Sequence, residues 1–281
     1  MIGPNENPGG SAPGFGALAL MRSLEQQMAQ MQGTPPDEAQ QLYYDAMEAA
    51  TDEDEFELIQ KALKLDPGNV DALLAVLQHR PLGEEDEIEV LRKIVALGEQ
   101  RLGQKAFKNC AGGFWGSIET RPYMRARVQL AEALRGAGRL DEAIVEWEAM
   151  LELNPNDNQA VRYALLACYL ALKRLDGAAR LFAKYDECPW NTMFAWGRVL
   201  ERWLVGDTAG AEQALAVARK QNAHAEAYLK GHKRLPNHLP EAYAPGSKEE
   251  AVCFAETLMV TWQAHPKALE WLAAQSRGRR G

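Results

Sequence analysis

Histidine and serine are the residue types in this chain that most often serve catalysis or metal binding. None of the five histidines is spaced from another His, Cys or acid as in an HExxH metal site. His232 and His238 lie close together on a loop-like stretch, where adventitious metal binding is the chemistry open to them. No serine lies in a GxSxG nucleophile elbow. The sequence therefore predicts no catalytic residue, no metal site, no cofactor and no enzyme.

Arginines are concentrated around one segment of an otherwise acidic chain. The 31 Lys and Arg against 39 Asp and Glu give a formal net charge of -8, which disfavours general attraction to nucleic acid or an anionic membrane. An arginine cluster favours an acidic peptide or a C-terminal carboxylate as its ligand, because the guanidinium pairs with carboxylates. The cluster consists of Arg121, Arg125, Arg127, Arg135 and Arg139.

Several features favour a cytoplasmic location. The four cysteines are widely spaced and form no CxxC pair, which favours reduced thiols over a zinc ribbon or a redox motif. No stretch approaches the roughly 18 consecutive apolar residues of a transmembrane helix. Residues 1–14 are rich in Gly, Pro and Asn and do not have the pattern of a signal peptide. We therefore expect no membrane association.

Paired helices must position the arginines. Residues 124–158 contain two amphipathic patterns joined by a glycine-containing turn at residues 136–138. A small residue lets two helices approach closely, and a large residue four positions later fills the adjoining groove. Small residues recur at nearly equal intervals, at Ala143, Ala178 and Ala211. A period close to 34 residues in a helical chain predicts an all-α fold, an α-solenoid of helical hairpins.

The sequence divides into segments of different character. Residues 1–36 are expected to be flexible apart from a short amphipathic helix at residues 17–32, whose Met/Leu stripe either packs on the array or docks into a second copy. Residues 103–122 interrupt the repeats with a Gly/aromatic insertion, for which packing and binding both stay open. The other predicted segments are a repeat array at 37–223, a C-terminal loop with capping helices at 224–276 and a basic tail at 277–281.

Residues 124–158 resemble the tetratricopeptide repeat. The consensus positions are held by Leu130, Ala131, Leu134, Gly138, Ala143, Trp147 and Pro155. The following two segments of similar length resemble the repeat more loosely, and residues 38–67 resemble it mainly at their end. The resemblance implies a right-handed solenoid that binds protein partners.

The resemblance also implies where a partner binds. The first helix of each hairpin lines the inner groove in this family, so residues 124–135, 158–169 and 192–203 are expected to face it. Arginines there would supply charge-assisted hydrogen bonds and aromatic rings would supply apolar contacts, although Tyr and Trp at helical spacing also pack in cores. The candidate partner-binding residues are Arg125, Arg135, Arg162, Tyr163, Trp196 and Trp203.

The C-terminal part has a second set of recognisable residues. They are His224, Tyr228-Leu229, Lys233-x-Leu235-Pro236, Gly246-Ser247-x-Glu249-Glu250-Ala251, Ala255, Trp262 and Ala268-Leu269. This pattern resembles the conserved tail of the suppression-of-tumorigenicity family and of related uncharacterised bacterial tetratricopeptide proteins. The eukaryotic members carry membrane segments that have no counterpart here, so no membrane role is implied. The apolar stripe after Ser247 predicts a helix that caps the solenoid.

The leading hypothesis is a cytoplasmic, non-enzymatic scaffold that binds a partner peptide or protein in the solenoid groove. A helical-repeat RNA-binding protein that uses the arginines and aromatics is one alternative. A non-catalytic subunit of an enzyme complex, in which the insertion and the C-terminal loop form a site, is another. The sequence does not identify the partner.

Overall fold

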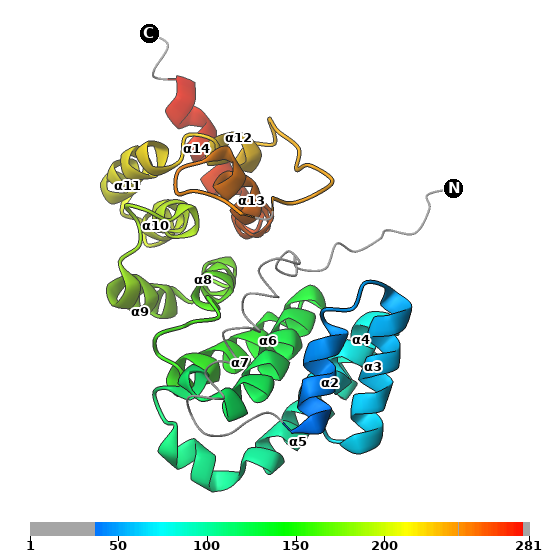
Figure 1. The fold of residues 1–281 in the computed structure, drawn as a ribbon. Helices are drawn as coiled ribbons and strands as arrows, with labels where there is room; N and C mark the ends of the chain where they lie inside the picture. Colours follow the sequence, from blue (N-terminus) through cyan, green and yellow to red (C-terminus); the bar gives the residue numbers. More distant parts are fainter. Residues whose placement is uncertain (1–36, 241, 278–281) are drawn as a thin grey trace. The chain divides into compact units, whose positions relative to one another are not determined.

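The computed structural model describes residues 37–240 and 242–277. Every regular element in these ranges is helical, and they contain no β-strand. Consecutive helices pack in pairs (Figure 1), so the all-α fold of helical hairpins expected from the sequence is confirmed. The helix predicted at residues 17–32 and most of the predicted basic tail lie outside the described residues.

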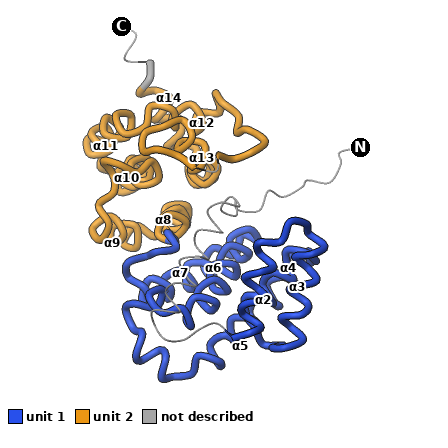
Figure 2. Tube along the Cα trace, viewed as in Figure 1, with its two compact units in different colours: residues 1–161 blue, residues 162–281 orange. Residues whose placement is uncertain are grey.

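The chain divides into two compact units, Met1–Val161 and Arg162–Gly281, which Figure 2 colours separately. We call them the N-unit and the C-unit. The division lies within the segment predicted as a repeat array, at the connection between two of its hairpins. The domain limits expected at residues 36 and 223 stay predictions.

The described part of the N-unit consists of the helix pairs α2/α3, α4/α5 and α6/α7, with two 3-10 helices before α6. The bounds are α2 Glu38–Ala46, α3 Asp52–Leu65, α4 Val70–His79, α5 Glu84–Asn109, η1 Phe114–Gly116, η2 Ile118–Thr120, α6 Arg121–Gly136 and α7 Leu140–Leu153. Side-chain caps begin several of these helices, as when Asn69 accepts a hydrogen bond from the N–H of Ala72 at 2.9 Å. Acidic residues fill the first turns of α3 and α5 and complement the helix dipoles.

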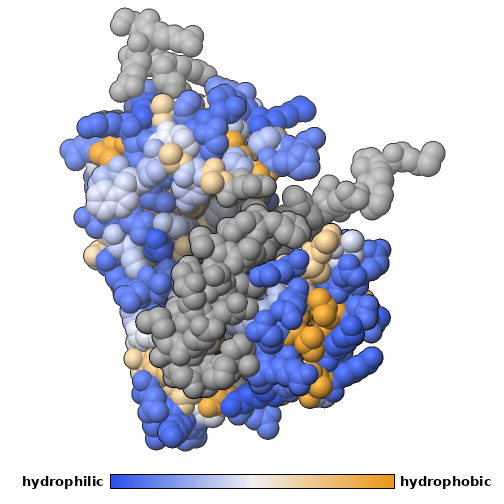
Figure 3. Space-filling view, in the orientation of Figure 1, coloured by the Kyte–Doolittle hydropathy of each residue, from blue (hydrophilic) through white to orange (hydrophobic). Residues whose placement is uncertain are grey.

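The α2/α3 hairpin and α4 share a small apolar core of short side chains. Its buried members are Ala46, Ile59, Ala62, Ala72 and Ala75. Larger apolar side chains around it, such as Leu42, Met47 and Leu58, are only partly buried. Figure 3 shows hydrophobic residues gathered on the surface over this part of the N-unit.

The α6/α7 hairpin has the packing that its repeat pattern predicts. Ala143 and Trp147 on α7 are both fully buried, so the small and the large side chain both belong to the core, as this pattern requires. Gly138 in the turn has φ +70°, and its N–H donates to the carbonyl of Arg135 at 3.0 Å. A left-handed backbone costs a residue other than glycine about 1–2 kcal/mol, which explains the glycine at this turn.

The irregular insertion predicted at residues 103–122 begins with a kink inside α5. Gly103 has φ 65° and ψ 167° there, and the helix resumes as far as Asn109. The rings of Phe107, Phe114 and Tyr123 then pack together, with centroids 5.0 to 6.1 Å apart. Phe114 is fully buried, so the aromatic part of the insertion is used for packing against α6.

The C-unit contains the pairs α8/α9 and α10/α11, followed by a short helix and two longer ones. The bounds are α8 Arg162–Ala171, α9 Leu175–Tyr185, α10 Thr192–Leu204, α11 Thr208–Gln221, α12 Ala225–Leu229, α13 Lys248–Gln263 and α14 Pro266–Arg277. The helix expected from residue 158 thus begins later, at Arg162. Asp157 and Ala160 have φ values of 50° and 59°, and such left-handed residues interrupt an α-helix.

Helix α13 packs on α8 and α10. Near its start, the ring of Phe254 lies 5.2 Å from the ring of Tyr163 at the start of α8. Just beyond its end, Nε2 of His265 donates to the carbonyl of Leu170 in the last turn of α8 at 2.8 Å. Because the starts meet each other and the ends meet each other, α13 runs parallel to α8. It therefore covers one side of α8 and one side of α10.

Candidate partner-binding site

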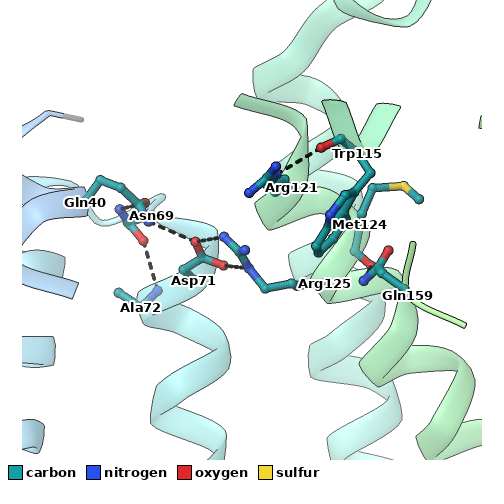
Figure 4. A network of polar contacts seen from close by, with 9 residues as sticks. All are labelled: Gln40, Asn69, Asp71, Ala72, Trp115, Arg121, Met124, Arg125 and Gln159. Atoms are coloured by element: carbon teal, nitrogen blue, oxygen red, sulfur yellow. Dashed lines mark hydrogen bonds and ion pairs between the residues drawn. The ribbon is translucent and has the colours of Figure 1, made fainter. Parts of the chain in front are cut away.

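Arg125 on α6 is held by a buried carboxylate. Its Nε and one terminal nitrogen donate to the two oxygens of Asp71 at 2.7 and 2.5 Å. Gln40 of α2 donates to the same carboxylate at 2.9 Å, and Asn69 donates to Gln40 at 3.0 Å (Figure 4). The Asp71 side chain is 0% exposed and that of Arg125 is 24% exposed. One polar network therefore joins α2, α4 and α6.

This network gives Arg125 a structural role in addition to the binding role predicted for it. Removing one partner of a buried ion pair leaves an uncompensated charge and costs about 3–5 kcal/mol. Substitution of Arg125 would therefore disturb the fold as well as any contact with a partner. The part of Arg125 that reaches solvent is positioned by Asp71.

The other arginines of the α6 cluster also have partners. Three of them pair with carboxylates at 2.5 to 2.7 Å, namely Arg127 with Glu146, Arg135 with Glu132, and Arg139 with Glu142. Arg135 is the most exposed arginine of the three, at 36%, and its partner Glu132 is 39% exposed. The positive charge of this cluster is thus largely balanced by neighbouring acids, which weakens the expectation that it attracts an acidic ligand.

Arg121 holds the insertion against α6. It is buried, its Nε donates to the carbonyl of Trp115 at 2.9 Å, and its guanidinium carbon lies 5.1 Å from the centroid of the Trp115 ring. Figure 4 shows this contact beside the Arg125 network. The hydroxyl of Thr120 hydrogen-bonds to the carbonyls of Phe114 and Ser117. These bonds fix the turns that lead into α6.

Arg162 and Tyr163 at the start of α8 share one carboxylate, that of Glu187. Arg162 Nε and the Tyr163 hydroxyl donate to its two oxygens at 2.7 and 2.8 Å. The guanidinium of Arg162 also lies 4.3 Å from the centroid of the Tyr163 ring and 5.3 Å from that of Tyr185. Burial, together with the hydrogen bond to Glu187, raises the pKa of Tyr163 above its usual value. Both predicted site residues are therefore engaged within the C-unit.

The two predicted tryptophans differ in exposure. Trp196 is 0% exposed, because α10 is packed against α8, α9, α11, α13 and α14. Its predicted contact with a partner is not supported by this position, and Trp196 is a packing residue in this structure. Trp203, in the last turn of α10, is partly exposed.

The cover that α13 places over α10 is the feature that sequence reasoning missed. The apolar stripe of Phe254, Leu258 and Trp262 predicts a cap on the array, and α13 packs on α10 and also reaches back to α8. The feature of the sequence that could have indicated this packing is the long connection at residues 230–247, which allows the following helix to pack on an earlier hairpin.

The described residues hold no group of three or more His, Cys, Asp or Glu side chains arranged to bind a metal ion. The buried carboxylate of Glu250 accepts hydrogen bonds from the backbone N–H groups of Thr192 and Gly246 and from the Gln221 side chain, at 2.6 to 3.0 Å. It therefore joins helix ends. No described helix has the length and apolarity needed to cross a bilayer.

The fold and these clusters define a class, that of helical-hairpin repeat proteins with partly exposed arginine and aromatic side chains. Residues 134–188 match the tetratricopeptide repeat family, a segment that runs from the end of α6 through α9. The comparison with curated proteins gave no match. Tetratricopeptide repeats generally mediate protein–protein interactions. The resemblance of the C-terminal part to the suppression-of-tumorigenicity family stays a prediction.

Proposed function

We propose that this chain is a non-enzymatic adaptor that binds a protein partner through the helical hairpins. The observation that carries the proposal is the tetratricopeptide match at residues 134–188, on a fold built from helical hairpins. The buried carboxylates Asp71 and Glu250 support a non-catalytic role, because both are engaged in bonds between helices. A cytoplasmic location belongs to the same proposal, and the four cysteines, which form no disulfide with one another, support it.

Exposure decides which predicted residues are the best contacts for a partner. Arg135 in the N-unit and Trp203 in the C-unit have accessible surface and no role in a buried ion pair. Arg125 and Arg162 are less exposed than Arg135, at 24% and 16% against 36%. These two residues and Tyr163 also hold segments of the fold together. We therefore assign direct contact to Arg135 and Trp203, and a supporting position to the other three.

The test compares single variants of the full chain as bait in affinity capture from the native cell. Arg135→Glu reverses one exposed charge in the N-unit, and Trp203→Ala removes one aromatic contact in the C-unit. Quantitative mass spectrometry should show at least a fivefold loss of one or more captured proteins with one of these variants. Circular dichroism checks that each variant is folded.

Matched controls use exposed residues outside the predicted site. Lys61→Glu reverses a charge on α3, where the lysine pairs only with Glu57 of the same helix. Val217→Ala removes an exposed apolar group from α11. Adaptor function would be refuted if wild-type chain enriched no protein over an unrelated acidic bait. The assignment of Arg135 and Trp203 would be refuted if both variants kept every partner as the controls do.

A further inference from the structure

The charge of this acidic chain is unevenly distributed. Residues 219–238, which we call the basic segment, contain five Lys and Arg residues and only one acid, Glu226. The basic residues are Arg219, Lys220, Lys230, Lys233 and Arg234. Three of the five histidines of the chain also lie in this segment. The segment is thus strongly positive, whereas the chain as a whole has a net charge of -8.

The inner part of the basic segment uses its only acid. Arg219 donates two hydrogen bonds to the carboxylate of Glu226, at 2.7 and 2.9 Å. Lys230 donates to the same carboxylate at 2.5 Å. Two cations therefore share one acid, which leaves no acid within the segment to balance the cations that follow.

The outer part presents the remaining cations to solvent. His232, Lys233 and Arg234 are exposed, as is His238. Apart from the Tyr228 ring under Lys233, the described residues provide no partner for Lys233 or Arg234, and they place no carboxylate at ion-pair distance from either. The connection between α12 and α13 extends outward from the helices in Figure 1.

The cations are held in place by a defined turn. Gly231 has φ +67°, and its N–H donates to the carbonyl of Tyr228 at 2.9 Å. The N–H groups of His232 and Lys233 both donate to the carbonyl of Ala227, at 2.8 and 3.1 Å. This pattern closes the end of α12 and fixes where the side chains that follow project.

We propose that the basic segment is a docking surface for an acidic segment, rich in Asp and Glu, of a protein partner. The proposal rests on the proposed adaptor function and names the class of its partner. Carboxylates are the complementary groups for exposed Lys and Arg side chains, and the Arg234 guanidinium offers paired donors to them. The α6 cluster is a poorer surface for such a partner, because its arginines already have acidic neighbours.

A nucleic acid fits this surface less well than an acidic protein segment. Single strands bind by stacking bases on exposed aromatic rings as well as by phosphate contacts. The aromatic residue of the basic segment, Tyr228, is only 2% exposed, and Lys233 lies over its ring.

The experiment measures binding of a fluorescent ten-residue glutamate peptide to the full chain by anisotropy, at low and at high salt. Wild-type chain should bind the peptide, and binding should weaken as salt rises. The double variant Lys233→Glu/Arg234→Glu should lose at least tenfold in affinity. The control Lys61→Glu/Lys93→Glu makes the same change in net charge at two lysines that pair within their own helices, and it should change the affinity less than twofold. Circular dichroism melts confirm that both variants are folded.

Three outcomes would overturn the proposal. The first is equal loss in both double variants, which would make the effect one of net charge. The second is no binding of the peptide by the wild-type chain. The third is tighter binding of a single-stranded oligonucleotide, lost in the Lys233/Arg234 variant, which would assign the surface to nucleic acid. Capture from the native cell with the same variant separates this proposal from adaptor function. If the variant still captures the same proteins as wild type, the adaptor function is retained and docking at the basic segment is refuted.

Discussion

The Asp71–Arg125 pair gives the sharpest test of how the N-unit is held together. Arg125→Met keeps much of the length of the side chain and removes its charge and donors. Asp71 is then left fully buried with Gln40 as its remaining side-chain donor. We predict that this single change strongly destabilises the N-unit, because the buried carboxylate loses its charged partner.

The magnitude follows from the geometry. Loss of one partner from a buried ion pair costs about 3–5 kcal/mol. Arg125 is 24% exposed, so some water can replace it, and the expected loss falls to about 2–4 kcal/mol. Asn at position 71 carries no charge to bury, so Asp71→Asn/Arg125→Met should recover at least about 1 kcal/mol of that loss. The double variant should thus be more stable than Arg125→Met alone.

The assay is urea unfolding of the full chain, followed by circular dichroism. For a slope near 2 kcal/mol/M, the predicted loss lowers the urea midpoint by about 1–2 M. Hydrogen exchange measured by mass spectrometry should locate the change in peptides from α2, α4 and α6, which the network joins. Arg135→Met is the matched control, since its pair is exposed and contributes at most about 1 kcal/mol. The interpretation is refuted if Arg125→Met and Arg135→Met differ by less than about 0.5 kcal/mol, or if the double variant is the least stable.

Two further predictions concern the C-unit and its close contacts. A Cβ atom at Gly177 would lie 2.7 Å from the Tyr169 ring, so Gly177→Ala should cost about 1–3 kcal/mol in urea unfolding. Gly136→Ala, with nothing within 4 Å of the added atom, should be neutral or slightly stabilising, and equal effects of the two changes would contradict the packing argument. The raised pKa of Tyr163 favours its protonated form in the folded state, so this stabilisation is complete below the unfolded pKa of about 10 and is lost as the pH rises above it. Tyr163→Phe should therefore lose less stability than wild type between pH 8 and pH 10.5, and equal losses in urea midpoint would refute that role.

The repeat pattern predicted much of the fold because it reports local geometry. Ala143 and Trp147 are both buried on one face of α7 because a small and a large residue are spaced about one helical turn apart, a spacing that is visible in sequence. The turn at Gly138 could be predicted for the same reason, since a turn that needs a positive φ favours glycine. The late start of α8, at Arg162, could not be predicted from the sequence. Asp157 and Ala160 adopt left-handed conformations, and these conformations cannot be predicted from the two residue types.

The candidate site was less predictable because exposure depends on distant segments. Trp196 has the residue type of a binding contact, and its helix belongs to a hairpin whose first helix was expected to face a groove. It is buried in a helix on which α8, α9, α11, α13 and α14 all pack, and α13 and α14 lie more than fifty residues later in the chain. The repeat period and the composition describe α10 and α13 separately, and neither predicts that these two helices pack together. Position within a repeat therefore indicated where a partner could bind without showing what already covered the surface.

The charge pattern of the sequence was a poor guide to the binding surface, because ion pairing also depends on distant segments. A cluster of arginines on α6 and in the turn after it suggests a positive surface. Arg127 and Arg139 each pair with an acid of α7, so little of their charge is left for a ligand. The basic segment contains a similar number of cations, and Glu226 is its only acid. What distinguishes the two regions is the number of acids that the fold brings within ion-pair distance. A charged partner should respond to that difference, so the unpaired cations Lys233 and Arg234 should affect its binding more than the arginines of α6 do.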